Sequence, residues 1–148
     1  MSSPLLEVKD LQVVVGEENK VLLDGLNLTV NAGETHVLMG HNGAGKSTLM
    51  KSILGMVHID EGSILYKGQE LVGKKSHEIV PMGISLVPEG RKIFIELSVE
   101  KNLEIGTFFR KRPPERDKEL LDMVYKVFPR LYERRNQLGG TLSGGEQQ

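Results

Sequence analysis

The stretch that decides the fold reads "GHNGAGKS" and spans residues 40–47. It fits the pattern G-x-x-x-x-G-K-[ST], a glycine-rich loop that wraps the phosphates of a nucleotide. The glycines at 40, 43 and 45 permit backbone angles at which successive N–H groups point at phosphate oxygens. Lys46 would place its ammonium on the β and γ phosphates, and the Ser47 hydroxyl would complete the coordination of Mg²⁺. The sequence therefore predicts a phosphate-binding loop that works with Mg²⁺.

The segments on either side of this loop favour the same interpretation. "THVLMG", residues 35–40, is a short apolar run that we predict to be a strand, and "KSTLMKSILG", residues 46–55, has apolar residues at helical spacing. The positive end of a helix that starts near Lys46 would attract an anion to the loop. We therefore expect the order strand, loop, helix.

Other strands are predicted before residue 90, from short runs that are apolar or alternating and rich in β-branched residues. They are residues 5–15 and 21–30, separated by a turn at 16–19, then a strand and turn over 61–71, and a buried strand over 83–90.

After Ser98 the spacing of apolar residues becomes helical. One helix is expected to begin after Pro113 and Pro114 and to be interrupted at Pro129. Its apolar face is formed by Leu120, Leu121, Val124, Val127 and Phe128. We therefore predict two parts, a β region with a partial α/β core over residues 1–90 and a helical subdomain over residues 91–148.

Composition excludes several classes of function. The chain has 148 residues, of which 19 are basic and 20 acidic, and it contains no cysteine. With a net charge of -1, no global field attracts nucleic acid or an anionic membrane. Disulfides and thiolate metal sites are excluded, the N-terminus does not resemble a signal peptide, and no apolar run approaches the ~20 residues of a membrane span. We expect neither a nucleic-acid partner nor direct membrane insertion.

A second motif, "LSGGE", occupies residues 142–146 near the end of the sequence. Together with the phosphate loop it resembles the ATPase subunits of ABC transporters, whose signature motif it matches. In that family two ATPase domains pack head to tail. The resemblance implies that the signature residues Ser143, Gly144, Gly145 and Glu146 meet the ATP held on the partner's loop, with the serine and both glycines facing its γ-phosphate. The plainer interpretation of these residues is a serine-capped helix start.

The resemblance implies ATP and Mg²⁺ as ligands of the first motif, with Ser47 on the metal. The residues expected to bind ATP are Gly40, His41, Asn42, Gly43, Ala44, Gly45, Lys46, Ser47 and Thr48. The fold implied is α/β, a partial P-loop NTPase core with an antiparallel N-terminal β region and a helical subdomain, without the C-terminal strands of the family.

Longer segments point to a subfamily. Residues 82–106 and the final run "FPRLYERRNQLGGTLSGGEQQ" resemble the ATPase that powers import of branched-chain amino acids. "GETHVLMG", by contrast, is similar to the ABC-type ATPase of iron-sulphur cluster assembly. The alternatives are therefore an importer subunit, a cluster-assembly ATPase, and an engineered or chimeric P-loop module without catalysis.

Three positions depart from the general family pattern. Glu89 stands where many members have glutamine, although the branched-chain subfamily commonly has glutamate there. Val15 takes the place of the aromatic residue that usually stacks on adenine. His41 stands where proline is frequent, and we interpret it as a tolerated loop residue rather than a catalytic base.

The resemblance also implies groups that these 148 residues lack: the Mg²⁺-binding aspartate of the Walker B strand, the glutamate that activates water, and the switch histidine. No catalytic residue set is therefore complete here, and we expect these residues alone to bind nucleotide with little or no hydrolysis. Without neighbouring strands, the apolar run at 35–40 would expose a sheet edge, so we expect self-association or rearrangement. The complete protein is expected in the cytoplasm, at the inner face of the cell membrane, with a second ATPase subunit and membrane permease subunits.

Overall fold

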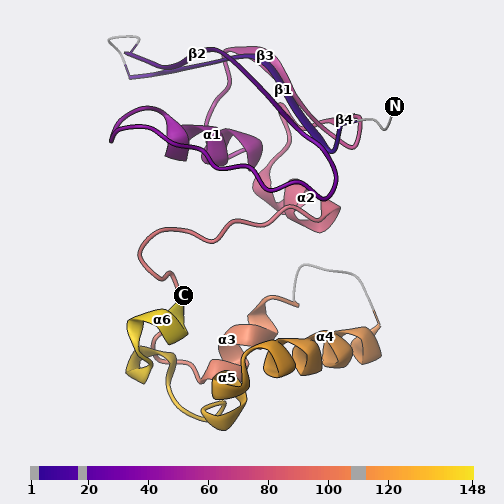
Figure 1. Ribbon diagram of the computed structural model, residues 1–148, viewed down its shortest axis with the longest axis vertical. Helices are drawn as coiled ribbons and strands as arrows, with labels where there is room; N and C mark the ends of the chain where they lie inside the picture. The colour runs from indigo at the N-terminus through magenta and orange to yellow at the C-terminus, as the bar shows by residue number, and fades with distance from the viewer. Residues whose placement is uncertain (1–3, 17–19, 108–112) are drawn as a thin grey trace. The chain divides into compact units, whose positions relative to one another are not determined.

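The computed structural model describes residues 4–16, 20–107 and 113–148 (Figure 1). The chain forms two compact units, Met1–Leu86 and Val87–Gln148. The phosphate loop belongs to the first unit and the signature motif to the second.

The first unit is built on a four-stranded antiparallel sheet. Its strands are β1 (Leu6–Val15), β2 (Lys20–Val30), β3 (Glu61–Tyr66) and β4 (Gln69–Glu70), in the order β2-β1-β3-β4. The predicted strands over 5–15, 21–30 and 61–71 are confirmed, whereas the turn at 16–19 lies largely outside the described residues. The N-terminal antiparallel β region is therefore present.

The first helix closes the core of this unit. α1 (Lys46–Ile53) lies against one face of the sheet, as Figure 1 shows. Leu49 is completely buried and belongs to one apolar cluster with Leu11 and Ile64 from the strands. Two short elements, α2 (Ser76–Ile79) and the 3-10 helix η1 (Val80–Met82), follow the sheet. Burial of the apolar face of α1 thus fixes the helix that starts directly after the phosphate loop.

The second unit is helical, as predicted. Its elements are α3 (Val99–Ile105), α4 (Pro114–Val127), α5 (Pro129–Glu133), the 3-10 helix η2 (Gly139–Thr141) and α6 (Gly144–Gln147). The helix boundaries follow from the prolines: Pro114 fits the first turn, and Pro129 begins a new helix after α4 has ended. Tyr125 and Tyr132 join α4 to α5 edge to face, with ring centroids 5.2 Å apart.

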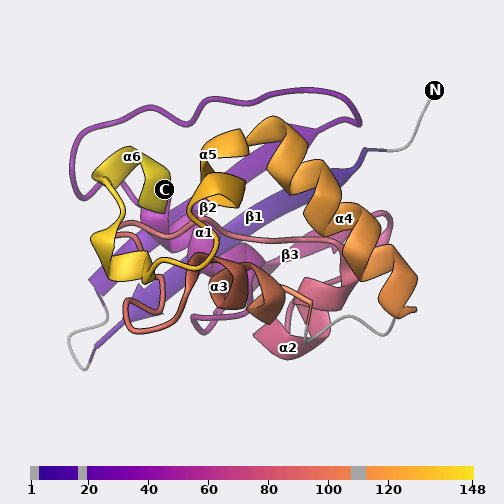
Figure 2. The same ribbon diagram turned by 90° about the horizontal axis from the view of Figure 1, so that it is seen from below.

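Two predicted strands are wrong. Residues 35–40 form an irregular segment, drawn as a long coil before α1 in Figure 2, and residues 83–90 also lack strand structure. Val37 and Met39 are 78% and 85% exposed. The physical reason is that a strand needs a neighbour for its backbone groups, and among the described residues no strand pairs with either segment. Both apolar runs therefore lie in irregular segments, and neither forms the edge of a sheet.

Truncation of Leu49 tests the role of α1 in this core. Leu49→Ala should lower the free energy of unfolding by about 2–5 kcal/mol, because it removes buried methyl groups and leaves a cavity. Met50→Ala is the matched control on the next residue, which is 37% exposed and should cost much less. Urea unfolding followed by circular dichroism measures both. Equal losses in the two variants would contradict this account of the core.

Candidate functional site

The phosphate loop has one firm attachment to the sheet, through Gly45. This residue precedes α1 with φ 86°, a left-handed conformation that favours glycine. A Cβ at position 45 would lie 2.6 Å from Leu23 Cδ2 and 3.0 Å from the Leu22 carbonyl oxygen. Only hydrogen fits there, so the loop backbone rests directly on β2.

Lys46 closes the loop from the inside. Its ammonium donates hydrogen bonds to the carbonyl oxygens of Gly40 at 2.6 Å and His41 at 2.8 Å. The Ala44 N–H donates to the His41 carbonyl at 3.2 Å. An ammonium has three donors, so one remains for an oxygen outside these two contacts. The lysine therefore holds the loop as a ring and keeps its positive charge within it.

The start of α1 supplies further donors. Leu49 N–H donates to the Gly45 carbonyl at 2.9 Å, the first turn of the helix. The N–H groups of Lys46, Ser47 and Thr48 consequently have no acceptor inside the helix. Ser47 is exposed. Backbone donors, an ammonium and an accessible hydroxyl in adjacent positions suit a phosphate group with Mg²⁺.

The loop histidine does not point to acid–base chemistry. His41 Nδ1 lies 2.8 Å from the Asn42 carbonyl oxygen, and since a carbonyl only accepts, Nδ1 carries the proton in this contact.

Gly43 has φ 86°, and a Cβ added there would meet no heavy atom within 4 Å, so its role is conformational rather than steric.

A carboxylate-centred turn precedes the loop. Glu34 accepts hydrogen bonds from the Asn31 N–H at 3.0 Å and the Asn31 side-chain amide at 2.9 Å, and its carboxylate pairs with His36 Nε2 at 2.9 Å. These contacts lower the pKa of Glu34 to about 2, and the hydrogen bond with His36 contributes most. The carboxylate therefore stays ionised and organises the chain between β2 and the loop.

The signature motif forms a capped helix start. Ser143 precedes α6, and Glu146 accepts the Ser143 N–H at 2.9 Å in a capping box. Glu146 also pairs with Arg134, whose Nε lies 3.5 Å from its Oε1. Hydrogen bonding from Ser143 is the main reason why the pKa of Glu146 is lowered. Glu146 thus has a structural role within its own unit.

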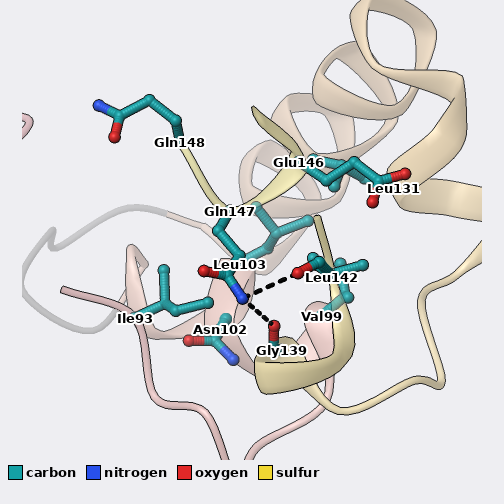
Figure 3. A pocket seen from close by; sticks show the side chains of 10 residues that line it. All are labelled: Ile93, Val99, Asn102, Leu103, Leu131, Gly139, Leu142, Glu146, Gln147 and Gln148. Atoms are coloured by element: carbon teal, nitrogen blue, oxygen red, sulfur yellow. Dashed lines mark hydrogen bonds between the residues drawn. The ribbon is translucent and has the colours of Figure 1, made fainter. Parts of the chain in front are cut away.

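Gln147 ties this motif to the preceding turn, as Figure 3 shows, and Asn102 holds the segment before α3. Gln147 Nε2 donates to the carbonyls of Gly139 at 3.2 Å and Leu142 at 3.0 Å. Asn102 accepts from the Phe94 N–H and donates to three carbonyls, those of Phe94, Leu97 and Ser98. The side chains of Gln147 and Asn102 line a pocket of about 150 Å³ next to α6.

Sequence reasoning did not identify Asn102. The available signal was its position inside α3, because asparagine is a poor helix former that competes for backbone hydrogen bonds.

Arg91 is a second residue that sequence reasoning missed. A Cβ at Gly144 would lie 2.8 Å from Arg91 Nη2 and 3.0 Å from its Cζ, so the guanidinium rests on the signature glycine. Arg91 has φ 50°, an unusual angle for a residue with a side chain. The guanidinium therefore lies beside the signature motif, in a conformation the local backbone must hold.

The predicted site residues fall into two groups. The loop residues 40–48 lie in the first unit, whereas Glu89 and residues 143–146 lie in the second. Glu89 is exposed in a turn that precedes Arg91.

Across the described ranges, no cluster of three or more histidine, cysteine, aspartate or glutamate side chains could hold a metal. Nor is any helix in that part of the chain long and apolar enough to cross a membrane.

Comparison with known proteins identifies close relatives. A family model described as "ABC transporter" matches residues 23–148. The chain is 46% identical to the high-affinity branched-chain amino acid transport ATP-binding protein BraG of Pseudomonas aeruginosa, over 85% of the chain and 53% of that protein. It is 30% identical to the probable branched-chain amino acid transport ATP-binding protein LivF of Archaeoglobus fulgidus, over 95% of the chain and 59% of that protein.

The fold is also found among solved structures. One described as an ATP binding subunit of an ABC transporter superposes with a TM-score of 0.83 at 29% identity, covering 97% of this chain and 57% of the other. A nucleotide-free ATP-binding cassette from an ABC transporter gives 0.75 at 27% identity, over 98% of this chain and 61% of the other. The chain thus spans between half and two thirds of the length of these proteins.

The Glu34 turn should respond to acid. Because the pKa of Glu34 is lowered from 4.5 to about 2, its stabilising effect should be complete above pH 4.5 and lost as the pH falls toward 2. Carbon-detected NMR of the side-chain carboxyl should show a midpoint at about 2. His36→Ala should raise that midpoint, whereas His58→Ala, at an exposed position in another segment, should not. An unchanged midpoint in His36→Ala would contradict the assignment.

The contact of Arg91 with Gly144 can be tested by paired substitutions. Gly144→Ala should displace the guanidinium and shift the NMR signal of Arg91 Nε–H, since the added methyl would overlap Nη2. Gly145→Ala is the control, because a Cβ added there would meet no heavy atom within 4 Å. Both changes should leave unfolding within about 1 kcal/mol of the parent, because the arginine tip can move and alanine favours a helix. Identical Arg91 signals in both variants would refute the contact.

Proposed function

The chain belongs to the ABC transporter family of ATPases, and from this premise we propose that it binds Mg-ATP through residues 40–48. The observation that carries the proposal is the ring closed by Lys46, whose ammonium bridges the Gly40 and His41 carbonyls. Gly45 packs closely against Leu23 and so holds that ring at the start of α1. In this proposal, Lys46 exchanges part of its carbonyl contacts for phosphate oxygens, and Ser47 binds Mg²⁺.

The signature motif is proposed to act on a second nucleotide. Ser143 and the N–H groups of Gly144 and Gly145 would face the γ-phosphate of ATP bound to another ATPase subunit, in a head-to-tail pair. Support comes from the side-chain contacts that hold the motif: Glu146 caps Ser143, and Gln147 ties it to Gly139 and Leu142. Glu89 is proposed as the residue of the connecting loop that contacts the metal or its water.

The work of the complete protein is proposed to be import of branched-chain amino acids. Both curated relatives described above are named as branched-chain amino acid transport proteins, which favours this function over the iron-sulphur alternative. Its partners would be membrane permease subunits, and its place would be the cytoplasmic face of the membrane. Hydrolysis would use the Mg²⁺-binding aspartate, the glutamate and the histidine that the family resemblance implies beyond the signature.

Titration calorimetry with Mg-ATP tests the loop. Lys46→Ala should weaken binding about tenfold or more, because each hydrogen bond from a charged donor contributes about 1.5–3 kcal/mol. Lys51→Ala is the matched control: it removes an exposed lysine in the last turn of the same helix and should leave the affinity unchanged. Equal affinities in all three proteins would refute the assignment.

Turnover is tested separately by phosphate release. We expect these 148 residues to release no phosphate above background, since phosphoryl transfer needs a group that orients water and a second acid on the metal. Lys46→Ala serves as the background. Release that exceeds this background would show that the chain itself contains the catalytic groups.

A further inference from the structure

A pocket of about 420 Å³ lies in the first unit, and its first wall begins just after α1 ends. The segments 55–59 and 71–75 line it, so none of its residues belongs to the phosphate loop at the start of that helix. Sites for small molecules commonly measure about 300–1,000 Å³. The pocket is therefore large enough for a small ligand, at a position that the proposed function does not use.

The two lining segments are held together by close contacts. Gly55 has φ 63°, and a Cβ at this position would overlap the Lys74 carbonyl oxygen. In the adjoining residues, Ser76 Oγ donates a hydrogen bond to the Leu54 carbonyl at 2.7 Å. These links set the spacing of the two walls, so the pocket is a fixed part of the folded unit.

One carboxylate orders the second wall. Glu70 Oε1 accepts three backbone N–H groups at 3.0 Å each, and the donors are those of Ile64, Leu71 and Val72. The path of the chain into the second wall is therefore fixed, and the negative charge of Glu70 is directed at backbone donors.

Two further carboxylates flank the lining segments and are also engaged by the backbone. Asp60 Oδ2 accepts the Val14 N–H at 2.7 Å. Glu78 accepts the Lys75 N–H at 2.8 Å, and this bond is the main reason why the pKa of Glu78 is lowered, with smaller contributions from nearby positive charges. Both acids thus have hydrogen-bond partners other than the side chains that line the pocket.

The pocket combines apolar and positively charged side chains. Val57, Ile59 and Val72 are partly buried in its walls, and Lys74 and Lys75 add two ammonium groups. No carboxylate is among the described residues that line it, and across the described ranges neither ammonium forms an ion pair. Two positive charges beside an aliphatic surface suit an anion that carries a hydrocarbon chain.

From these features we infer that the pocket binds a small aliphatic carboxylic acid. Its carboxylate is held by Lys74 and Lys75, and its chain packs on Val57, Ile59 and Val72. An amino acid with the same chain binds less well, because its ammonium meets two like charges and no carboxylate. Inorganic phosphate also binds less well, because it leaves the apolar wall uncovered. The site is independent of nucleotide binding by residues 40–48.

Amide NMR titration of the full chain with isocaproate tests the inference. Saturable shifts are expected at residues 55–59 and 71–75. Leucine adds an ammonium to the same skeleton, isohexanol replaces the carboxylate by a hydroxyl, and inorganic phosphate has no chain. Each of these three should bind at least about fivefold more weakly than isocaproate. Comparable affinity for any one of them, or no saturable shift with isocaproate at these residues, would overturn the inference.

Substitution of Lys74 provides the second arm of this experiment. Lys74→Gln keeps much of the aliphatic stem and should weaken isocaproate binding about fivefold or more, because the charge and its hydrogen bonds are lost. Lys118→Gln is the matched control, an exposed lysine on α4 in the second unit, and it should leave the affinity unchanged. Circular dichroism confirms that both variants remain folded. Equal affinities of Lys74→Gln and Lys118→Gln for isocaproate would refute the role of Lys74.

Discussion

The contact of Gly45 with β2 is the constraint on which the loop over residues 40–48 depends. Its left-handed backbone turns the chain into α1, and the absence of a side chain lets that turn touch Leu22 and Leu23. The helix then buries Leu49 in the same apolar cluster that includes Leu23. The C-terminal end of the loop is therefore fixed twice, by the backbone contact of Gly45 and by the burial of α1 that follows it. This arrangement keeps the donors of Lys46, Ser47 and Thr48 together at the start of α1.

The second unit positions its motif by a different kind of interaction. Its helices bury few apolar side chains completely, and α4 buries none. Instead, side-chain amides donate hydrogen bonds to backbone carbonyls. Asn102 binds carbonyls of the segment before α3, and Gln147 links α6 to the η2 turn. Such bonds are directional, so they specify the path of the backbone, before α3 and at the signature motif, more precisely than apolar contacts could. Arg91 adds a positive charge directly over Gly144.

Local patterns predicted most of the regular structure. The strands β1, β2 and β3 follow from alternation and β-branched residues, and α1 and α4 from helical spacing with proline or glycine at their starts. The two failures, at residues 35–40 and 83–90, have equally apolar patterns. Their composition suits a strand, but a strand forms only where another backbone can pair with it, and that is a property of the whole fold. Exposed Val37, Met39 and Val87 are the result.

The sequence by itself determined the family, the phosphate loop and the signature motif, because each depends on residue types at set spacings along one chain. Only the tertiary structure decided which glycine the loop rests on, which carbonyls Lys46 bridges, and which residues support the signature motif. Two of those contacts join residues far apart in the chain: Gly45 with Leu23, and Arg91 with Gly144. Spacing along a sequence cannot specify them, because they arise from the path that the backbone takes in space.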